Sequence, residues 1–554
     1  MVDVGGTLPH EKKGSPLAIR SGLAVKSLDN VNEPSLDPRL SLSSSSRPET
    51  LRDGQPYTHP GPAEKSPSVD GVLYVEFEPG DARNPPSFPR PKKWVVTSFA
   101  CFSTLMASSA AAAYNLGFPS MTKDLNCSEF QATVGFIVFT LGFGLVPLVS
   151  SSFSEEFGRQ PLYIGSATGF TMMYLLIALS KNIQTVTAAR FLQGSFGSTF
   201  ATMVGGTIAD LWIPRERGLP MAIFSLAALA GSGLGPLSAG WIEMNPRLQW
   251  RWIQWIQMMY AERFFFSSTF SHDLRICGIY SLLLPFAMKE TRSSILLTRL
   301  AKKIRNETGD DRYRARIEDQ RASLRSLIIL SCTRPVHLLF TEPVVSAFSL
   351  WIGFLWGVMF TMIESIPGIF RDLHGFNVGQ EGLAFTSIAV GAFLGFATNF
   401  YQERLYHQHF ERRGPEARLI LACAAAVILP ISMFIYAWCS FPWVHWISLV
   451  IAITVYIWAT FTVYLSVFSY LADCYGPFAS SALAGQSLCR NLMATIFPLF
   501  TKQMYSNLGY NWANTMFALI ATIMVPIPFV LFFFGPAIRG RSRFSRLVMQ
   551  QQPN

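Results

Sequence analysis

The chain has 554 residues, of which half are hydrophobic and only 14% are charged. Soluble globular proteins carry roughly 25% charged residues, so the composition excludes an ordinary cytosolic enzyme and indicates many membrane-spanning helices. The net charge of +10 does not indicate a nucleic-acid partner, because most lysines and arginines lie beside apolar runs, where they set membrane orientation.

The chain opens with a polar segment. Residues 1–91 are rich in Ser, Pro, Gly and charge, which predicts a disordered cytosolic tail. Apolar runs then predict a first bundle of six spans over 92–288. The predicted spans are 94–117, 130–152, 162–180, 185–208 and 218–242, with a sixth within 252–288.

The sixth span is poorly defined. Residues 259–275 contain acidic and basic side chains from Glu262 to Arg275, and a charge at the centre of a span costs roughly 2.5–3.5 kcal/mol. Either this span is displaced to about 274–288, or the stretch is an insertion or an error in the gene model.

A charged loop, 289–334, separates the first bundle from a second one over 335–537, and a C-terminal tail covers 538–554. The predicted spans of the second bundle are 341–367, 380–401, 417–439, 443–471, 479–504 and 513–536. Basic residues concentrate on the side of the two termini, so the positive-inside rule places both termini in the cytosol.

Short charged motifs lie at the predicted cytosolic helix ends. In the loop after the second span, Gly158 predicts a tight turn between Glu155 and Arg159, although an ordinary charged turn would look the same. Asp210 ends the fourth span within plausible reach of Arg159. We therefore predict a latch that locks one conformation. Its predicted members are Glu155, Gly158, Arg159, Asp210, Arg217 and, at the matching end of the tenth span, Asp473.

Two ionisable residues lie in apolar context. Arg190 stands about five residues inside the fourth span, where a guanidinium needs water, an acid or backbone carbonyls as partners. Glu364 lies in the seventh span, and burial favours the neutral form of a carboxyl group. We predict that Arg190 is a functional residue and that Glu364 binds and releases a proton; the alternatives are a snorkelling arginine and an exposed interfacial acid.

The fifth span carries small residues. Gly231 and Gly235 form a small-xxx-small face for close helix approach, and Pro236 removes a backbone hydrogen bond. Together with Gly240, they predict a helix at a gate or between the two bundles, with plain packing as the alternative.

Aromatic and polar residues in several spans could line a substrate cavity and favour organic cations through cation–π contacts. The candidates are Tyr114, Asn115, Gln193, Trp356, Phe360, Tyr464, Phe468 and Arg490. The sequence has no GxSxG, P-loop, HExxH or CxxC motif, so we expect neither an enzyme nor a metal or cofactor site.

Taken together, these motifs resemble the major facilitator superfamily, and within it the fungal twelve-span drug:proton antiporters that include polyamine and multidrug exporters. The resemblance covers about 78–546. It rests on the Ser154–Pro161 loop, Arg190–Gly194, Gly205–Asp210, the Gly-Pro motif at 231–240 and Asp473–Arg490.

The resemblance implies an all-α fold of two six-helix bundles that rock around a central cavity and export small organic compounds in exchange for protons. It implies proton coupling at Arg190, a cytosolic latch at 154–161 with Asp210, and an antiporter kink at Gly235 and Pro236. A polyamine exporter, a secondary-metabolite pump and a non-transporting nutrient sensor remain alternatives. We expect a monomer in the plasma membrane, with the vacuolar membrane as the other location.

Overall fold

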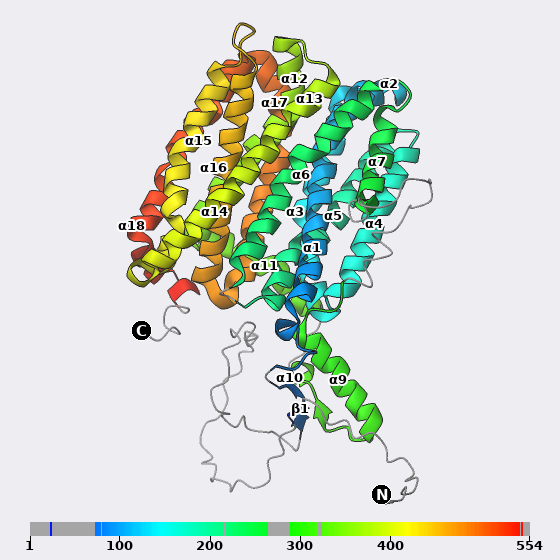
Figure 1. The fold of residues 1–554 in the computed structure, drawn as a ribbon, viewed down its shortest axis with the longest axis vertical. Helices are drawn as coiled ribbons and strands as arrows, with labels where there is room; N and C mark the ends of the chain where they lie inside the picture. Colours follow the sequence, from blue (N-terminus) through cyan, green and yellow to red (C-terminus); the bar gives the residue numbers. More distant parts are fainter. Residues whose placement is uncertain are drawn as a thin grey trace, which may run out of the picture.

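The computed structural model contains two groups of helices that stand side by side, α1–α7 and α12–α18 (Figure 1). The described residues are 23–24, 72–78, 80–213, 216–263, 288–319, 324–542 and 544–546. The first helix begins at Arg90 and the last ends at Arg541 on the same face of the bundle, which we call the terminal face. The opposite face carries α2 and α13.

The N-terminal half covers the first five predicted spans. Its elements are α1 (Arg90–Ala113), η2 (Tyr114–Gly117), α2 (Phe118–Asp124), α3 (Glu129–Glu156), α4 (Arg159–Leu179), α5 (Ile183–Leu211), α6 (Gly218–Met244) and α7 (Gln249–Arg263). The region of the sixth span therefore starts with a helix at Gln249, and the rest of that prediction, 264–287, lies outside the described residues.

The C-terminal half is built in the same way. Its elements are α12 (Pro343–His374), α13 (Val378–Ala384), α14 (Thr386–Arg413), η4 (Gly414–Leu419), α15 (Ile420–Trp438), α16 (Ile447–Tyr475), η5 (Gly476–Phe478), α17 (Ala479–Met524) and α18 (Pro526–Arg541). Gly509 has a φ of +74° and divides α17 into two helices, so the last predicted span consists of the end of α17 together with α18.

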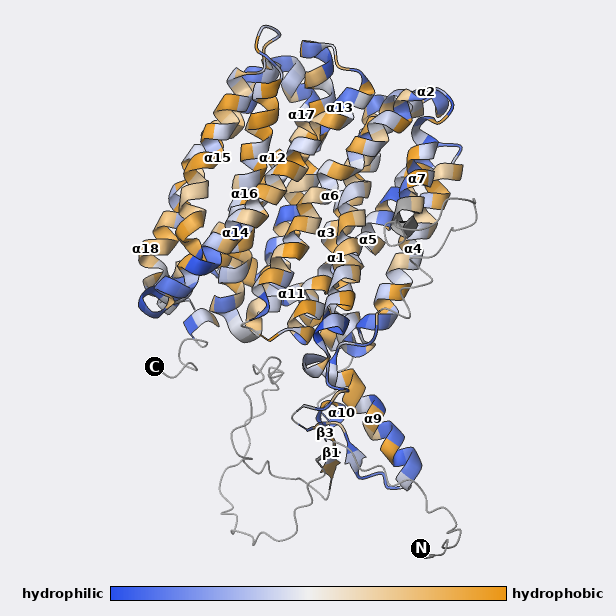
Figure 2. Cartoon of the chain, viewed as in Figure 1, coloured by the Kyte–Doolittle hydropathy of each residue, from blue (hydrophilic) through white to orange (hydrophobic). Residues whose placement is uncertain are grey.

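Eight stretches of the described residues are long and apolar enough to cross a membrane. Two of them, Val378–Trp438 and Ala479–Arg541, have 61 and 63 residues, enough for two crossings each at 1.5 Å per residue. The lateral surface of both halves is hydrophobic, with exposed side chains such as Leu179 and Phe393, whereas polar residues gather at the helix ends (Figure 2). This surface is suited to contact with lipid chains.

Local signals fix the helix ends that matter for the site. Ser128 and Gln131 form a capping box at the start of α3, with mutual hydrogen bonds of 2.9 and 3.2 Å. Asn182 caps α5 by accepting from the N–H of Thr185. Between α3 and α4, Gly158 has a φ of +92°, a conformation that favours glycine, and turns the chain so that α4 starts at Arg159.

A small module lies at the terminal face, within the segments predicted to be a tail and a loop. It contains β2 (Leu73–Tyr74), which pairs in parallel with β4 (Tyr313–Arg314), and the helices α9 (Ser293–Thr308) and α10 (Arg316–Asp319). Val75, Ala301 and Ala315 form its buried core. A second pair joins β1 (Leu23–Ala24) to β3 (Glu76–Phe77), and η1 (Pro85–Ser87) leads into α1.

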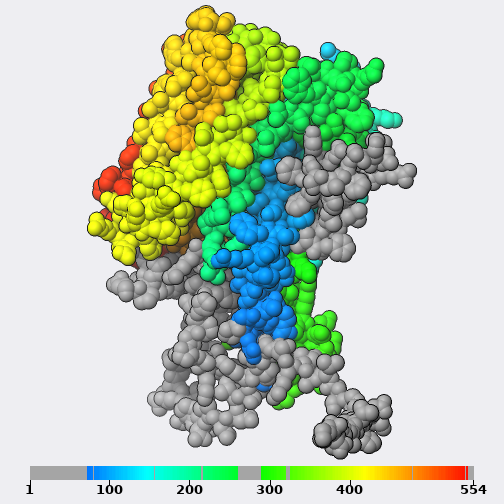
Figure 3. Space-filling view, viewed as in Figure 1, coloured from blue at the N-terminus to red at the C-terminus, as the bar shows by residue number. Residues whose placement is uncertain are grey.

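The two halves are in contact with each other, and helices of each half form the interface (Figure 3). Across this interface, α3 packs on α17, and α6 packs on α13 and α14. At the terminal face, α11 (Leu324–Thr341) contacts both α3 and α17. These contacts frame the space that lies between the halves.

Candidate functional site

A cavity of about 2370 Å³ lies between the two halves. Its walls come from α1, α3, α5 and α6 on one side and α12, α14, α16 and α17 on the other. Residues at the terminal end of these helices, such as Arg159, Glu216 and Glu403, belong to its lining. The cavity therefore reaches the terminal face.

The opposite face is closed by contacts between the halves. The hydroxyls of Thr140 on α3 and Thr495 on α17 are 3.0 Å apart. Nearer the opposite face, Glu129 at the start of α3 forms an ion pair with Lys502 of α17. The structure is therefore a state open at one face only, as alternating access requires.

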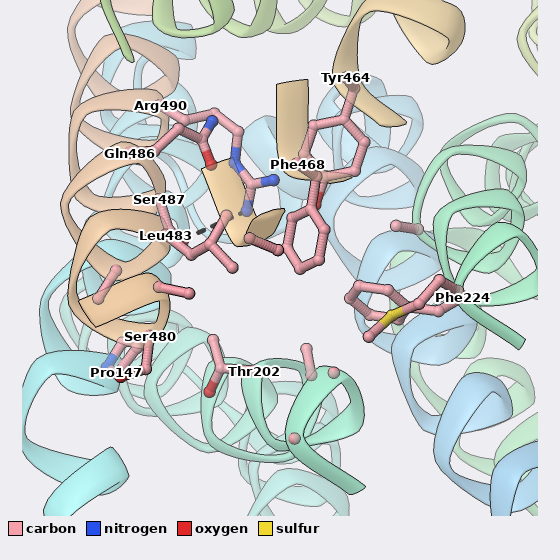
Figure 4. A pocket seen from close by; sticks show the side chains of 18 of the residues that line it. Pro147, Thr202, Phe224, Tyr464, Phe468, Ser480, Leu483, Gln486, Ser487 and Arg490 are labelled. Carbon is pink, nitrogen blue, oxygen red and sulfur yellow. Dashed lines mark hydrogen bonds between the residues drawn. The ribbon is translucent and has the colours of Figure 1, made fainter. Parts of the chain in front are cut away.

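Aromatic side chains and one arginine form the central wall of the cavity. Trp356, Phe360, Tyr464, Phe468 and Arg490, all predicted as cavity residues, belong to the lining. The rings of Trp356 and Tyr464 are 5.0 Å apart. Figure 4 shows Arg490 pointing from its helix toward Tyr464 and Phe468. This wall offers a largely apolar surface with one cation.

Arg190 lies inside the N-terminal half, fully buried and outside the cavity lining. Its guanidinium donates to the carbonyl oxygens of Ala110 (3.1 Å) and Gly135 (3.4 Å) and to the side-chain oxygen of Gln193 (2.8 Å). It also stacks on Phe139, whose ring does line the cavity, at 4.5 Å. One ring thus separates Arg190 from the cavity.

Three residues predicted to line the cavity are buried within the N-terminal half instead, and two of them contact Arg190. The Tyr114 ring lies 4.1 Å from the guanidinium, and Gln193 accepts its hydrogen bond. Asn115 directly follows Tyr114 in η2 and is also buried. None of the three belongs to the described lining, because η2 and the start of α5 lie behind Phe139, a depth that sequence spacing does not reveal.

Glu364 lies between the halves on the side of the closed opposite face. The hydroxyls of Thr133 on α3 and Thr501 on α17 face its carboxyl group, and Lys502 is close. Its Oε2 atom is buried without a hydrogen-bond partner among the described residues. An acid in this position touches both halves, so its charge bears on whether they can separate.

At the terminal face, Arg159 forms an ion pair of 2.7 Å with Asp210 and donates to the carbonyl of Met203 at 3.1 Å. Arg217 donates to the carbonyls of Ala209 (2.8 Å) and Trp212 at the end of α5. The side chain of Glu155, a second acid predicted for the latch, lies outside the described residues.

Sequence reasoning missed Glu290 as a member of this cluster. Its carboxylate accepts from the backbone N–H groups of Arg159 (3.1 Å) and Gln160 (3.3 Å), and thereby caps α4. A Cβ at Gly158 would collide with it. The signal was the acid in the Glu290-Thr291-Arg292 segment, but no local pattern indicates a partner 131 residues away.

The C-terminal half repeats the pair between an arginine and the acid of the matching helix. Arg418 lies 3.1 Å from Asp473 and 2.9 Å from Glu403. It lies four residues after Gly414, which has a φ of +59°, whereas Arg159 directly follows Gly158. Sequence reasoning did not name Arg418 as a site residue, although its place after a turn glycine could have indicated it.

The glycines of α6 face two different partners. A Cβ at Gly231 would lie 2.5 Å from the carbonyl oxygen of Leu105 in α1, and one at Gly235 would lie 2.7 Å from the carbonyl oxygen of Ser109. A Cβ at Gly240 would lie 2.5 Å from the carbonyl oxygen of Val378, in the other half. Together with Pro236, whose carbonyl touches α13, these residues let α6 pack closely on both halves.

The chain is similar to known transporters in both sequence and fold. The Major Facilitator Superfamily model matches residues 100–473. The MFS-type efflux pump MFS2 of Trichophyton rubrum is 33% identical over 495 residues, 88% of this chain and 79% of that protein. Efflux pump atB of Aspergillus terreus is 35% identical over 419 residues, 74% of this chain and 84% of that protein.

A solved structure shares the fold. The proton:xylose symporter XylE of E. coli, bound to 6-bromo-6-deoxy-D-glucose, matches with a TM-score of 0.57 at 14% identity, over 83% of this chain and 99% of that one. The predicted membrane fold of two helix bundles is thereby confirmed. The chain belongs to the Major Facilitator Superfamily, a family of membrane transporters and not of enzymes.

Proposed function

We propose that this protein exports drugs or other small organic compounds, including secondary metabolites, in exchange for protons. The observation that carries the proposal is the large cavity between two repeated halves, open at the terminal face and closed at the other. Its relatives MFS2 and atB are efflux pumps. None of the relatives described above supports the polyamine alternative.

The proposed cycle starts with the terminal face in the cytosol, in keeping with basic residues such as Arg412, Arg413 and Arg541 at that end. Substrate enters the cavity there, and the two halves then rock to open the opposite face. Glu364 would take up a proton from outside when the opposite face opens. Arg190, behind Phe139, would couple the cavity to the packing of α1, α3 and α5.

The protein would act as a monomer in the plasma membrane or the vacuolar membrane, because the two halves of a single chain enclose a cavity between them. Its partners would be an organic substrate, protons and lipid. A nutrient sensor on the same fold would bind ligand without moving it, so a flux measurement separates the two functions.

The test uses inside-out vesicles that contain the full chain, with an acidic interior and a panel of small aromatic dyes of different charge. We expect accumulation of at least one dye, which stops when a protonophore collapses the gradient. Vesicles without the protein are the control. Accumulation that persists without the gradient would contradict proton coupling, and no accumulation of any dye would contradict export.

A further inference from the structure

The cavity has an uneven charge. Among the described lining residues, the arginines outnumber the acids by six to three. The arginines are Arg159, Arg217, Arg292, Arg334, Arg418 and Arg490. Each of the three acids already has a basic partner, since Glu216 pairs with Arg90, and Glu403 and Asp473 pair with Arg418. No lining acid is therefore left to attract a cationic substrate.

Arg490 differs from the other lining arginines by its place in the central aromatic wall. Its guanidinium lies 4.7 Å from the ring of Trp356 and 5.3 Å from that of Tyr464. Its hydrogen bond to the Ser487 hydroxyl is long, at 3.4 Å, and its Nε is buried without a partner in the part of the chain that the structure describes. Among the described residues, no carboxylate lies within 4.0 Å of it.

A neighbouring donor shares this situation. The amide nitrogen of Gln486, one helical turn before Arg490 on α17 and in the same lining, is buried and has no hydrogen-bond partner within the described ranges. Buried donors, and charged ones above all, are costly when they lack an acceptor. Two such donors on one wall of a substrate cavity are suited to an acidic group on the substrate.

The contacts of the aromatic rings also favour a negatively charged substrate. Cation–π contacts led us to expect organic cations, but the faces of Trp356 and Tyr464 are already occupied by Arg490. A cationic substrate beside them would meet a permanent positive charge, since a guanidinium does not deprotonate. Phe360 and Phe468 provide apolar surface nearby for the planar aromatic part of a substrate.

We infer that the cavity takes organic anions, namely aromatic compounds with a carboxylate or similar acidic group that binds Arg490 and Gln486. This inference names the substrate class of the proposed export function. A polyamine would instead place a positive charge against the positive charge of Arg490.

The test measures binding of three naphthalene probes to the purified full chain by calorimetry at neutral pH: 2-naphthoate, 2-naphthamide and 2-naphthylmethylamine. The wild type should bind the carboxylate most tightly. Arg490→Gln should weaken carboxylate binding by about 10- to 100-fold, the range of charge-assisted hydrogen bonds, and leave the neutral amide within about threefold. Arg490→Lys should retain more carboxylate binding than Arg490→Gln.

The matched control is Arg312→Gln, which removes an exposed arginine of the terminal module that pairs with Asp310. It should bind all three probes as the wild type does. Tighter binding of the amine than of the carboxylate, an equal loss for all probes in Arg490→Gln, or no carboxylate binding in the millimolar range would overturn the inference.

Vesicle flux with the same probes separates this inference from the proposed function. Arg490-dependent binding of 2-naphthoate without gradient-driven accumulation would contradict export but leave the anion site intact. Gradient-driven accumulation of the amine in preference to the carboxylate would support export and contradict the anion site.

Discussion

Arg190 is held by groups from three helices. Its guanidinium donates to main-chain carbonyls of α1 and α3 and to Gln193 on its own helix. A planar fork makes these contacts together, whereas a lysine ammonium is a compact point charge. The position of Arg190 therefore depends on the shape of the guanidinium as well as on its charge.

We predict that Arg190→Lys lowers gradient-driven export by at least about tenfold, the loss of roughly one charge-assisted hydrogen bond. Export is measured in vesicles and normalised to the amount of protein in the membrane. Arg251→Lys is the control, because Arg251 binds Asp124 near the opposite face. Wild-type flux in Arg190→Lys would remove Arg190 from the coupling mechanism.

Part of this site was open to prediction from the sequence. A permanent charge in an apolar run must be functional or snorkel, so Arg190 stood out. Its partners did not, because the carbonyls of Ala110 and Gly135 have no residue-type signature. The placement of Tyr114 behind Phe139 could not be predicted either, because sequence spacing does not reveal how deep a side chain lies. Aromatic and polar residues of several spans were predicted to line a cavity, and Trp356 and Arg490 do line it.

At the scale of elements, α6 depends on close contact with α1. A Cβ at Gly235 would overlap Ser109, whereas a Cβ at Gly165 in α4 would meet nothing within 4 Å. We predict that Gly235→Ala lowers the free energy of unfolding by about 1–3 kcal/mol through overpacking. Thermal unfolding of the purified protein measures the change.

The matched control is Gly165→Ala, which should leave stability unchanged or slightly raised, because alanine is the better helix former. If both variants unfold at the same temperature as the wild type, then α1 and α6 have room to separate, and the close-packing role of Gly235 is wrong.

Elements were predictable where one signal dominates. Runs of apolar residues located the spans, because the membrane demands about 20 such residues in each. The module of α9 with β2 and β4 was not predicted, since its strands have two residues each and pair across more than 200 positions of the chain. Within the predicted polar tail, Val75 is buried against Ala301 and Ala315, and Phe88 joins the core of the N-terminal half.

At the scale of the whole molecule, export requires the closed face to open. Thr140 and Thr495 are in contact across the two halves at the closed end of the cavity. We predict that a disulfide between cysteines placed at both positions abolishes export, and that a reductant restores it. Dye accumulation before and after reduction is the measurement.

The single variants Thr140→Cys and Thr495→Cys control for the native cysteines and should transport whether oxidised or reduced. Full export by the cross-linked double variant would mean that the halves do not separate at this contact, and alternating access by rocking would then be contradicted.

The permanent charge on Arg490 also has an electrical consequence. On the proposed orientation, a negative cell interior attracts the positive charge of Arg490 and so favours the state in which the empty cavity is open to the cytosol. The gain is up to about 2.3 kcal/mol per 100 mV for a charge that crosses the whole field. A bound monoanion cancels the charge and removes that pull. The membrane potential would then favour the inward-open state of the empty protein. The protein with a bound anion would change to the outward-open state without work against the potential.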